Sequence, residues 1–385
     1  MDFLDKKIDR RGFLKAAGQA AVGLGAGWFL FNNLLSDELS STPQTPLGNS
    51  SRRALFYRRL GSRIRCEICP HQCVLSEGEI SVCRVKTVRE GRLVTYAYGN
   101  PCAVHIDPVE KKPLYHFLPE SRIFSIATAG CNLRCLNCQN WEISQKRPAE
   151  TRNTTLPPAE VVQRAKGYGC KSIAYTYSEP IAFYEYMLDS SVLAKRSGVK
   201  NVWVTAGYIN QKPLKKLCEV VDAANVDLKG FNEETYNKLN AGSLRPVLET
   251  LKTLKKQGVW LEVTNLIVPR WTDDMDMIGE MCAWMRRNLG SDVPLHFSRF
   301  HPAYKLTQLP PTPTETLKKA RETALEAGLE YVYIGNLATK EGSNTYCPSC
   351  GKIVLGRRGY EVTEKNLQGS VCKFCGEKIA GVFQA

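Results

Sequence analysis

A regular alternation of short apolar runs and amphipathic segments, beginning near residue 122, restricts the fold of this chain more than any other feature. The apolar runs have the length and composition of buried strands, and the segments between them have the spacing of amphipathic helices. Strands and helices that alternate in this way build a parallel sheet covered by helices. The expected strands are residues 123–127, 172–177, 200–205, 223–228, 260–268 and 294–298.

Six helices are expected between and after these strands, at residues 157–168, 181–197, 212–220, 245–257, 274–288 and 314–328. Eight strand and helix units close a full α/β barrel, so six predict an α/β fold of the partial (β/α)6 barrel type. Functional groups in such folds lie at the carboxyl ends of the parallel strands. The chain has 385 residues, 43% of them hydrophobic, which suffices for this domain and smaller flanking modules.

Three cysteines directly follow the first expected strand and define a three-cysteine loop: Cys131, Cys135 and Cys138. Their C-x3-C-x2-C spacing allows three thiolates to face one 4Fe-4S cluster. A closed cluster takes four thiolates, so three leave one iron open to another ligand. A structural zinc ion and free thiols are the alternatives. Zinc requires a fourth ligand, and neither Cys nor His occurs in the next thirty residues.

A second group, the N-terminal cysteine set, comprises Cys66, Cys69, Cys73 and Cys83, with His71 among them. Four thiolates complete a metal site. Both zinc and an iron-sulfur cluster accept such a set, and the sequence does not choose between them. A structural zinc ion is the favoured hypothesis, with a second cluster and unligated thiols as the alternatives.

The C-terminal cysteine set consists of two pairs, Cys347 with Cys350 and Cys372 with Cys375, which are 21 residues apart. A glycine follows each pair and allows the tight turn that points backbone N–H groups at sulfur. This pattern predicts a zinc-ribbon-like module that binds Zn²⁺, with a redox dithiol pair or another cluster as alternatives. The remaining cysteines are scattered and are expected to be buried apolar residues: Cys102, Cys170, Cys218 and Cys282.

The first 35 residues carry the pattern of a twin-arginine export signal, because Arg10 and Arg11 precede a moderately apolar run at residues 16–35. No small-residue cleavage site follows the run, so the segment is a signal or a membrane anchor, and the protein is expected to be periplasmic or membrane-anchored. An amphipathic N-terminus on a cytoplasmic protein is the alternative. Residues 36–51, rich in Ser, Thr, Pro and Asn, are expected to form a flexible linker.

The formal net charge is +14. A net positive charge of this size favours binding to a nucleic acid or an anionic membrane surface, but it is also typical of an ordinary solvated protein surface. No base-stacking motif is present, so nucleic acid is the less favoured partner. The densest basic patch comes just before the N-terminal cysteine set, at Arg52, Arg53, Arg58, Arg59, Arg63 and Arg65.

Five motifs lie at or near the cysteines and strand ends between residues 60 and 340. They are the opening Cys66-x2-Cys69-Pro70 and residues 138–144, 175–180, 227–230 and 331–336. Together they resemble the activase-like branch of the radical S-adenosylmethionine (radical SAM) superfamily, and more closely the radical SAM component of the AmmeMemoRadiSam system. The resemblance implies that SAM chelates the open iron. Reductive cleavage of SAM then yields a 5'-deoxyadenosyl radical, which requires a low-potential electron donor.

The same resemblance identifies a SAM pocket among polar residues at the strand ends. Glu179 takes the place of the glutamate in a Gly-Gly-Glu turn and is expected to bind the SAM ammonium group. Asn137 stands where an aromatic residue that contacts adenine is usual. The further residues expected to bind the cofactor are Ser178, Thr205, Gly207, Asp227 and Lys229. Later strands add the polar candidates Glu262, Asn265, His296, Arg299 and His301.

The leading hypothesis is a radical SAM enzyme, oxidoreductase-type and activating-enzyme-like, that abstracts hydrogen from an unidentified small or macromolecular substrate, with a protein among the candidates. The alternatives are a glycyl-radical enzyme activase, an RNA-modifying radical SAM enzyme, and a non-catalytic iron-sulfur and zinc binding or electron-transfer protein. The expected domains are a signal or anchor (1–35), a linker (36–51), an N-terminal Cys-rich module (52–115), a radical SAM partial barrel (116–340) and a zinc-ribbon-like module (341–385).

Overall fold

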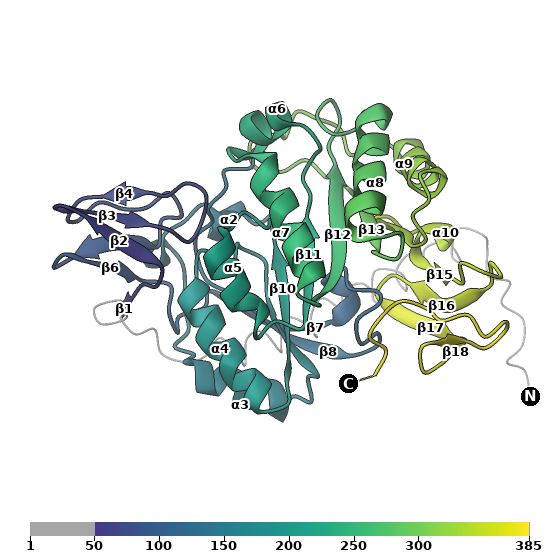
Figure 1. Cartoon of the computed structure of the whole chain (residues 1–385), viewed down its shortest axis with the longest axis horizontal. Helices are drawn as coiled ribbons and strands as arrows, with labels where there is room; N and C mark the ends of the chain where they lie inside the picture. The colour runs from purple at the N-terminus through teal and green to yellow at the C-terminus, as the bar shows by residue number, and fades with distance from the viewer. Residues whose placement is uncertain (1–50, 385) are drawn as a thin grey trace, which may run out of the picture. The chain divides into compact units, whose positions relative to one another are not determined.

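The structure, a computed structural model, describes residues 51–384, and an eight-stranded sheet runs through the middle of them (Figure 1). The strand order is β14-β13-β12-β11-β10-β9-β8-β7. Strands β8 to β14 are parallel, and β7 pairs with β8 in the antiparallel direction. The bounds are β7 (Ala103–Pro108), β8 (Arg122–Ala127), β9 (Ser172–Tyr175), β10 (Lys200–Thr205), β11 (Ala223–Asp227), β12 (Trp260–Ile267), β13 (Leu295–Arg299) and β14 (Val332–Gly335).

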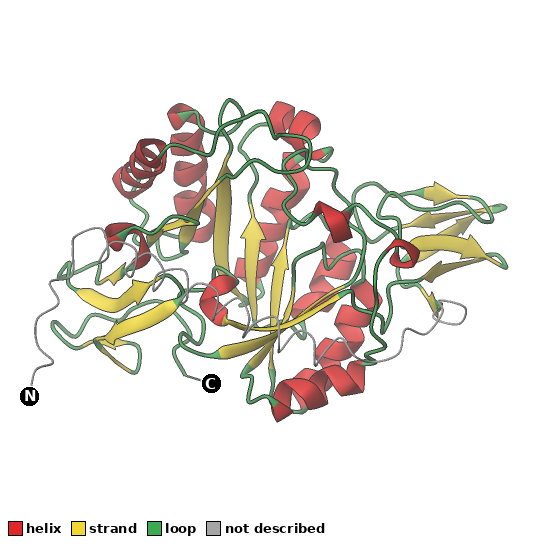
Figure 2. Ribbon diagram, turned by 180° about the vertical axis from the view of Figure 1, so that it is seen from behind, coloured by secondary structure: helices red, strands yellow, loops and turns green. Residues whose placement is uncertain are grey.

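Long helices cover the outer face of this sheet, as Figure 2 shows with red helices against yellow strands. They are α3 (Pro158–Gly167), α4 (Tyr184–Arg196), α5 (Gln211–Cys218), α7 (Leu244–Lys256), α8 (Met275–Leu289) and α9 (Thr314–Glu326). The six predicted strands and six predicted helices are thereby confirmed, with ends shifted by at most three residues. The α/β partial barrel is therefore the fold of this chain.

Short helical turns complete the barrel. They are η2 (Val109–Lys111), α2 (Trp141–Ser144), η3 (Pro148–Glu150), α6 (Glu233–Thr235), the π-helix η4 (Tyr236–Asn240) and α10 (Lys340–Ser343). The barrel core forms where the apolar stripes of the helices meet the sheet. In α7, for example, Val247, Leu251 and Leu254 recur at helical spacing and are buried.

Two strands of the sheet were not predicted, β7 and β14, and each lies at one edge. β7 has the sequence Ala-Val-His-Ile-Asp-Pro, in which polar residues and a terminal proline hide the strand pattern. β14 has only four residues, which is short for recognition by periodicity. The sheet therefore extends one strand beyond the six expected at each side.

The N-terminal part of the described chain forms two small antiparallel sheets, β1-β6-β5 and β2-β3-β4. A buried ion pair ties them to the barrel, because Lys86 Nζ lies 2.5 Å from a carboxylate oxygen of Glu185 in α4. The other Glu185 oxygen accepts a hydrogen bond from Leu55 N–H at 2.9 Å. The bounds are β1 (Arg52–Arg53), β2 (Tyr57–Leu60), β3 (Arg63–Cys66), β4 (Val74–Leu75), β5 (Lys86–Arg89) and β6 (Arg92–Thr95).

The C-terminal part forms a three-stranded sheet, β15-β16-β17, and a two-stranded ribbon, β18-β19. It is fixed to the barrel by Arg357, whose Nη2 donates to the Tyr115 carbonyl at 2.7 Å. The predicted domain boundaries near 116 and 340 fall within one compact unit, to which all the described residues belong. The bounds are β15 (Thr345–Tyr346), β16 (Ile353–Arg358), β17 (Glu361–Lys365), β18 (Leu367–Gln368) and β19 (Val371–Cys372).

The predicted signal at residues 1–35 and nearly all of the predicted linker lie outside the described residues. Within residues 51–384, no helix combines the length and apolar character that crossing a membrane requires.

Candidate active site

The three-cysteine loop begins where β8 ends, at the carboxyl edge of the parallel strands. Gly130 opens the loop with a φ of 99°, which a side chain would strain. A Cβ placed on it would lie 2.6 Å from the Cys83 carbonyl oxygen and 2.5 Å from a Val85 methyl carbon. The loop is also held by backbone hydrogen bonds, since Arg134 N–H donates to Asn240 O and Leu136 N–H donates to Leu239 O. Its three sulfurs are therefore carried by a fixed segment of backbone.

The thiols of this loop lie in a largely buried place and are close enough to affect one another's pKa. Burial, together with the neighbouring cysteines, raises the pKa of Cys131 well above its usual range and that of Cys138 to about 11. Two polar groups already point at sulfur, because Leu133 N–H lies 3.3 Å from Cys131 Sγ and Asn240 Nδ2 lies 3.2 Å from Cys135 Sγ. Burying three negatively charged thiolates is costly without a positive partner, and the iron ions of a cluster supply that positive charge.

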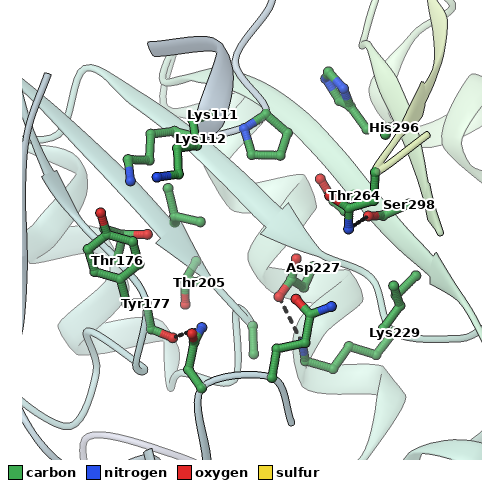
Figure 3. A pocket seen from close by; sticks show the side chains of 18 of the residues that line it. Lys111, Lys112, Thr176, Tyr177, Thr205, Asp227, Lys229, Thr264, His296 and Ser298 are labelled. Carbon is green, nitrogen blue, oxygen red and sulfur yellow. Dashed lines mark hydrogen bonds and ion pairs between the residues drawn. The ribbon is translucent and has the colours of Figure 1, made fainter. Parts of the chain in front are cut away.

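A cavity of about 540 Å³ opens beside the loop and extends over the strand ends (Figure 3). Such a volume suits a cofactor-sized ligand. The predicted residues that line it are Cys131, Cys135, Cys138, Ser178, Glu179, Thr205, Asp227, Lys229 and His296. The lining residues that sequence reasoning missed include Glu110, Lys111, Lys112, Tyr115, Asn336 and Tyr360.

Glu179 is the most constrained carboxylate in the cavity. It is buried, and burial raises its pKa, although three hydrogen bonds offset part of that effect. Thr205 Oγ1 donates to one carboxylate oxygen at 2.6 Å, and Ala206 N–H donates to the other at 2.8 Å. Ile181 N–H also donates at 3.2 Å. This carboxylate is therefore aligned before any ligand binds.

Asp227 and Lys229 form an ion pair of 2.8 Å at the end of β11 (Figure 3). Burial opposes the charged form of Lys229, but the Asp227 carboxylate and the nearby Cys135 raise its pKa overall. The positive charge of Lys229 in turn lowers the pKa of Cys138 against the effect of burial. The ammonium group is thus placed to balance negative charge at the three-cysteine loop.

Two predicted pocket residues have structural contacts that differ from the expectation. Gly207 is not among the cavity-lining residues, and a Cβ on it would lie 2.9 Å from a methyl carbon of Val226, so the glycine serves close packing. Ser178 lines the cavity, but its hydroxyl donates to the Thr128 carbonyl at 2.6 Å. Ser178 therefore joins the ends of β8 and β9.

A cationic corner that sequence reasoning missed lies across the cavity from Asp227 and Lys229 (Figure 3). Lys111 Nζ and Lys112 Nζ lie 2.9 and 2.6 Å from the two carboxylate oxygens of Asp107. The Tyr177 hydroxyl donates to the same carboxylate. Burial opposes the Asp107 charge, but these partners hold the pKa of Asp107 well below its usual range. Because β7 is antiparallel to β8, this corner lies toward the amino ends of the parallel strands, where no site residue was expected.

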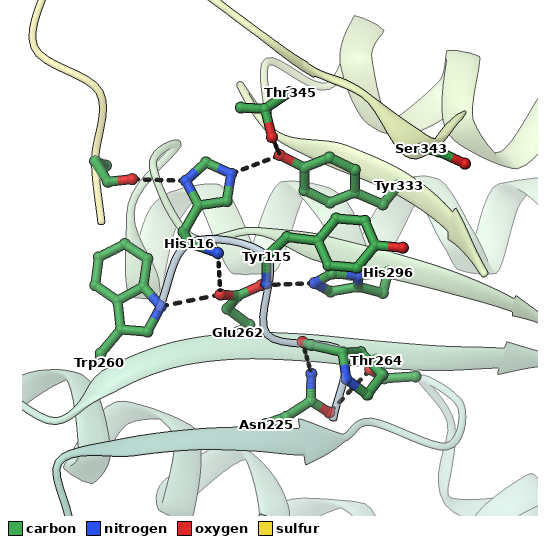
Figure 4. Close-up of polar contacts among 12 residues, drawn as sticks. Tyr115, His116, Asn225, Trp260, Glu262, Thr264, His296, Tyr333, Ser343 and Thr345 are labelled. Carbon is green, nitrogen blue, oxygen red and sulfur yellow. Dashed lines mark hydrogen bonds and ion pairs between the residues drawn. The ribbon is translucent and has the colours of Figure 1, made fainter. Parts of the chain in front are cut away.

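Glu262 was expected in the pocket, but it anchors the loop that follows η2 (Figure 4). Its oxygens accept hydrogen bonds from the backbone N–H of Tyr115 at 3.0 Å and of His116 at 2.8 Å. His296 Nε2 lies 2.7 Å from the same carboxylate, and the His296 side chain also lines the cavity. Four donors around this carboxylate, including Trp260 Nε1, satisfy it fully, so its contacts are explained by the fold.

Three further candidates on late strands do not line the cavity. Asn265 Nδ2 donates to the Leu228 carbonyl at 2.7 Å and joins β12 to the end of β11. Arg299 Nε donates to Thr312 O at 2.9 Å, and His301 is exposed.

The residues present fit both a three-thiolate cluster and SAM. The cavity offers one buried carboxylate for an ammonium group at Glu179. It also offers an unpartnered acceptor, because Asn137 Oδ1 is buried and accepts no hydrogen bond within the described residues. An adenine amino group is a donor of the kind that this oxygen lacks.

The four sulfurs of the C-terminal cysteine set lie close enough together to bind a single metal ion. Its four sulfurs all lie within 4.8 Å of one another. Cys347 Sγ lies 3.5 Å from Cys375 Sγ, and Cys350 Sγ lies 3.8 Å from Cys372 Sγ. A tetrahedral zinc ion with Zn–S bonds of 2.3 Å separates its sulfurs by about 3.8 Å. This set can therefore bind one metal ion, and zinc stays the predicted ion.

The sequence of this chain is similar to those of several known proteins. Residues 125–282 match the radical SAM superfamily. The uncharacterized protein MJ0808 of Methanocaldococcus jannaschii is 49% identical over 331 residues, which cover 85% of this chain and 98% of that protein. The pyruvate formate-lyase 1-activating enzyme of Escherichia coli K12 is 25% identical over 210 residues, covering 50% of this chain and 84% of the enzyme.

Solved structures show more distant likeness. Streptococcus suis SuiB bound to S-adenosylmethionine has a TM-score of 0.45 and 12% identity, covering 59% of this chain and 53% of SuiB. A radical SAM methyltransferase from Sphaerobacter thermophilus has a TM-score of 0.45 and 14% identity, covering 62% of this chain and 71% of that one.

Proposed function

Because this chain belongs to the radical SAM superfamily, we propose that its 540 Å³ cavity binds SAM against the three-cysteine loop and presents it to a substrate that loses a hydrogen atom. The chain is a radical SAM enzyme. When bound, the cluster and SAM supply the reductive cleavage that yields a 5'-deoxyadenosyl radical. The observation that supports the site assignment best is that the three thiols and the prealigned Glu179 carboxylate line one cavity.

Each residue of the cavity has a role under this proposal. Glu179 accepts hydrogen bonds from the SAM ammonium group, and Thr205 keeps the carboxylate oriented. Asn137 accepts from the adenine amino group. Lys229, paired with Asp227, balances the negative charge of the ligated thiolates. Glu179 and Asn137 therefore bind the two polar ends of one ligand.

The test is the formation of 5'-deoxyadenosine from SAM by the anaerobically reconstituted protein reduced with dithionite. We expect product from the wild type and none from the variant Cys131→Ala/Cys135→Ala/Cys138→Ala. A matched variant, Cys102→Ala/Cys170→Ala/Cys218→Ala, changes the same number of cysteines outside the three sets and keeps the product. A wild type that holds its cluster but forms no 5'-deoxyadenosine would contradict the proposal.

A second candidate, the activation of a glycyl-radical enzyme, has one observation in its favour. The chain matches 84% of the length of a pyruvate formate-lyase 1-activating enzyme at 25% identity. The resemblance to the radical SAM component of the AmmeMemoRadiSam system is likewise a proposal. Incubation with a glycyl-radical enzyme from the same genome, SAM and dithionite should give a protein-based radical signal in electron paramagnetic resonance (EPR). Formation of 5'-deoxyadenosine without that signal speaks for another substrate.

A further inference from the structure

The N-terminal cysteine set has no role in the proposed function, yet the fold holds it in a fixed place. β3 ends at Cys66, Cys69 and Cys73 lie in the turn that leads to β4, and Cys83 precedes β5. Cys66 N–H donates to the Cys73 carbonyl at 2.9 Å and closes that turn. Val82 N–H points at Cys73 Sγ at 3.5 Å, which brings the segment of Cys83 back to the turn. Four thiols thus converge from two strand ends.

The thiols of this set lie in a mostly buried place. Cys66 and Cys83 are buried, and Cys69 and Cys73 are partly buried. The Ser81 hydroxyl lies 3.1 Å from Cys83 Sγ, so a polar group already contacts one of the sulfurs. A metal group bound by the four sulfurs would therefore be largely shielded from water.

The spacing of the sulfurs distinguishes a single ion from a cluster. Within residues 51–384, no three sulfurs of the N-terminal cysteine set lie within 4.8 Å of one another, and the same holds for the three-cysteine loop. The C-terminal cysteine set, in the same structure, does meet that limit. A cluster holds its thiolates on separate irons, so they lie farther apart than thiolates on one ion. Among the described residues, the N-terminal set thus differs in sulfur spacing from the C-terminal set and agrees with the three-cysteine loop in exceeding this limit.

The Nε2 nitrogen of the histidine within the set is engaged by another contact. His71 Nε2 lies 2.7 Å from the Asn132 carbonyl oxygen, so this nitrogen donates to the three-cysteine loop. The ring also packs edge-on against Tyr208, with centroids 5.3 Å apart. Four cysteines remain, which is the number that closes a 4Fe-4S cluster.

We propose that the N-terminal cysteine set binds a second 4Fe-4S cluster directly beside the three-cysteine loop. Three contacts join the two places: Gly130 packs on the Cys83 carbonyl, His71 donates to the Asn132 carbonyl, and an Arg134 guanidinium N–H donates to the Val82 carbonyl. The proposal replaces the structural zinc ion that the sequence favoured.

The position of this second cluster gives it a function, which rests on the proposed function of the cavity. One electron from a reduced low-potential carrier protein reduces the second cluster and then passes to the cluster of the three-cysteine loop. The second cluster returns to its oxidised state, and no bond forms or breaks at it. The oxidised carrier is the only other product of this step.

Metal analysis of the variant Cys131→Ala/Cys135→Ala/Cys138→Ala tests the site without any need for SAM cleavage. After anaerobic reconstitution we expect about eight irons per wild-type chain and about four in this variant, with equal sulfide. The reduced variant should show the EPR signal of one reduced cluster. A variant with no iron and an additional zinc ion in place of the second cluster would overturn the proposal. This variant keeps the N-terminal cysteine set intact, so the result does not depend on the folding of altered strands.

A second measurement tests the electron path. In fully reduced wild type, two adjacent paramagnetic clusters should split or broaden each other's EPR signal, and the variant with only the second cluster should lack this effect. The variant Cys66→Ser/Cys69→Ser/Cys73→Ser/Cys83→Ser should likewise show a single unsplit signal. Two clusters without magnetic interaction would overturn the electron path. Failure of SAM cleavage in a protein with two interacting clusters would instead count against the proposed function alone.

Discussion

At the scale of single residues, Glu179 is the side chain on which cofactor binding most depends. Its carboxylate is buried and already aligned by Thr205 and Ala206. We expect Glu179→Gln to weaken SAM binding about 10- to 100-fold, because a charge-assisted hydrogen bond is worth about 1.5–3 kcal/mol. Equilibrium binding of SAM to the oxidised, reconstituted protein measures this directly.

The iron content of Glu179→Gln should stay at the wild-type level, since the glutamate is not a ligand of the cluster. A suitable control is Glu160→Gln, which removes a carboxylate paired with Arg164 on α3 and is expected to leave SAM affinity unchanged. Equal SAM affinity in Glu179→Gln and wild type would mean that the ammonium group binds elsewhere.

His116 is expected to make the stability of the protein depend on pH, and its surroundings explain why. The side chain is fully buried, and burial lowers its pKa to about 4. Nδ1 donates to the Ala380 carbonyl at 2.6 Å, and Nε2 accepts from the Tyr333 hydroxyl at 2.5 Å (Figure 4). These contacts accommodate a neutral imidazole, and burial favours this neutral form.

The sign of the pH effect follows from the protons that each state binds. Between pH 6.5 and pH 4 the unfolded chain protonates His116 and the folded chain does not, so the free energy of unfolding falls as the pH falls. The expected loss across this window is about 3 kcal/mol. Urea unfolding at several pH values should show this slope in wild type and a smaller one in His116→Gln. Equal slopes would contradict the assignment.

At the scale of elements, the junction between β8 and the three-cysteine loop is set by Gly130. A Cβ there meets a carbonyl oxygen and a methyl carbon at 2.6 and 2.5 Å, and its φ is 99°. We expect Gly130→Ala to cost about 2–4 kcal/mol of stability and to lower iron content, because overpacking adds to backbone strain.

Gly169 offers a matched control for Gly130. Its φ is 67°, but a Cβ on it would meet nothing within 4 Å. Gly169→Ala should therefore cost only about 1 kcal/mol, the backbone effect alone, with iron unchanged. Equal losses in the two variants, measured by urea unfolding and iron analysis, would show that the contact with Cys83 is not important.

The elements also show what the sequence could and could not predict. Parallel strands β8 to β13 were predictable because buried strands leave apolar runs of recognisable length. The SAM-binding candidates at their ends were predictable because strand ends share one edge. Lys111 and Lys112 were not, since they follow an edge strand with a mixed pattern. The position of Glu262 was predictable, but its partners were not, because the loop at Tyr115 and His116 reaches it from far along the chain.

The C-terminal cysteine set predicts a metal-dependent element. Few apolar side chains are buried in this part of the chain, among them Val354, Leu355, Leu367 and Ile379, so a bound ion has to supply much of the stability. Cys375→Ser should lower the zinc content from about one per chain and expose residues 345–384 to limited proteolysis. Ser349→Ala, a change at an exposed residue of the first cysteine pair, should have neither effect. Unchanged zinc in Cys375→Ser would contradict the assignment.

At the scale of the whole molecule, two predictions remain, one about location and one about the source of electrons. The twin-arginine signal stays a prediction about location, and replacement of Arg10 and Arg11 would test it. The low-potential donor also stays a proposal, but the described surface suggests its chemistry. Arg59 and Arg63 are exposed on β2 and β3, and Ile80 and Val82 are exposed apolar residues in the segment before Cys83. Exposed basic side chains attract an acidic carrier protein, and exposed apolar side chains add contact area.

This surface leads to a prediction about rates. If a reduced acidic iron-sulfur carrier protein docks there, Arg59→Glu/Arg63→Glu should slow its electron transfer about tenfold at low ionic strength, because charges at an interface rim govern association. Added salt should slow the wild type and affect the variant much less. Stopped-flow reduction of the clusters measures both rates.

Arg286→Glu/Arg287→Glu on α8 is a control that makes the same change in net charge on another exposed surface. It should leave the rate near that of wild type. Reduced methyl viologen, a small cation, should not be slowed by Arg59→Glu/Arg63→Glu, so a loss of rate with both reductants would indicate a damaged cluster instead of a lost docking surface.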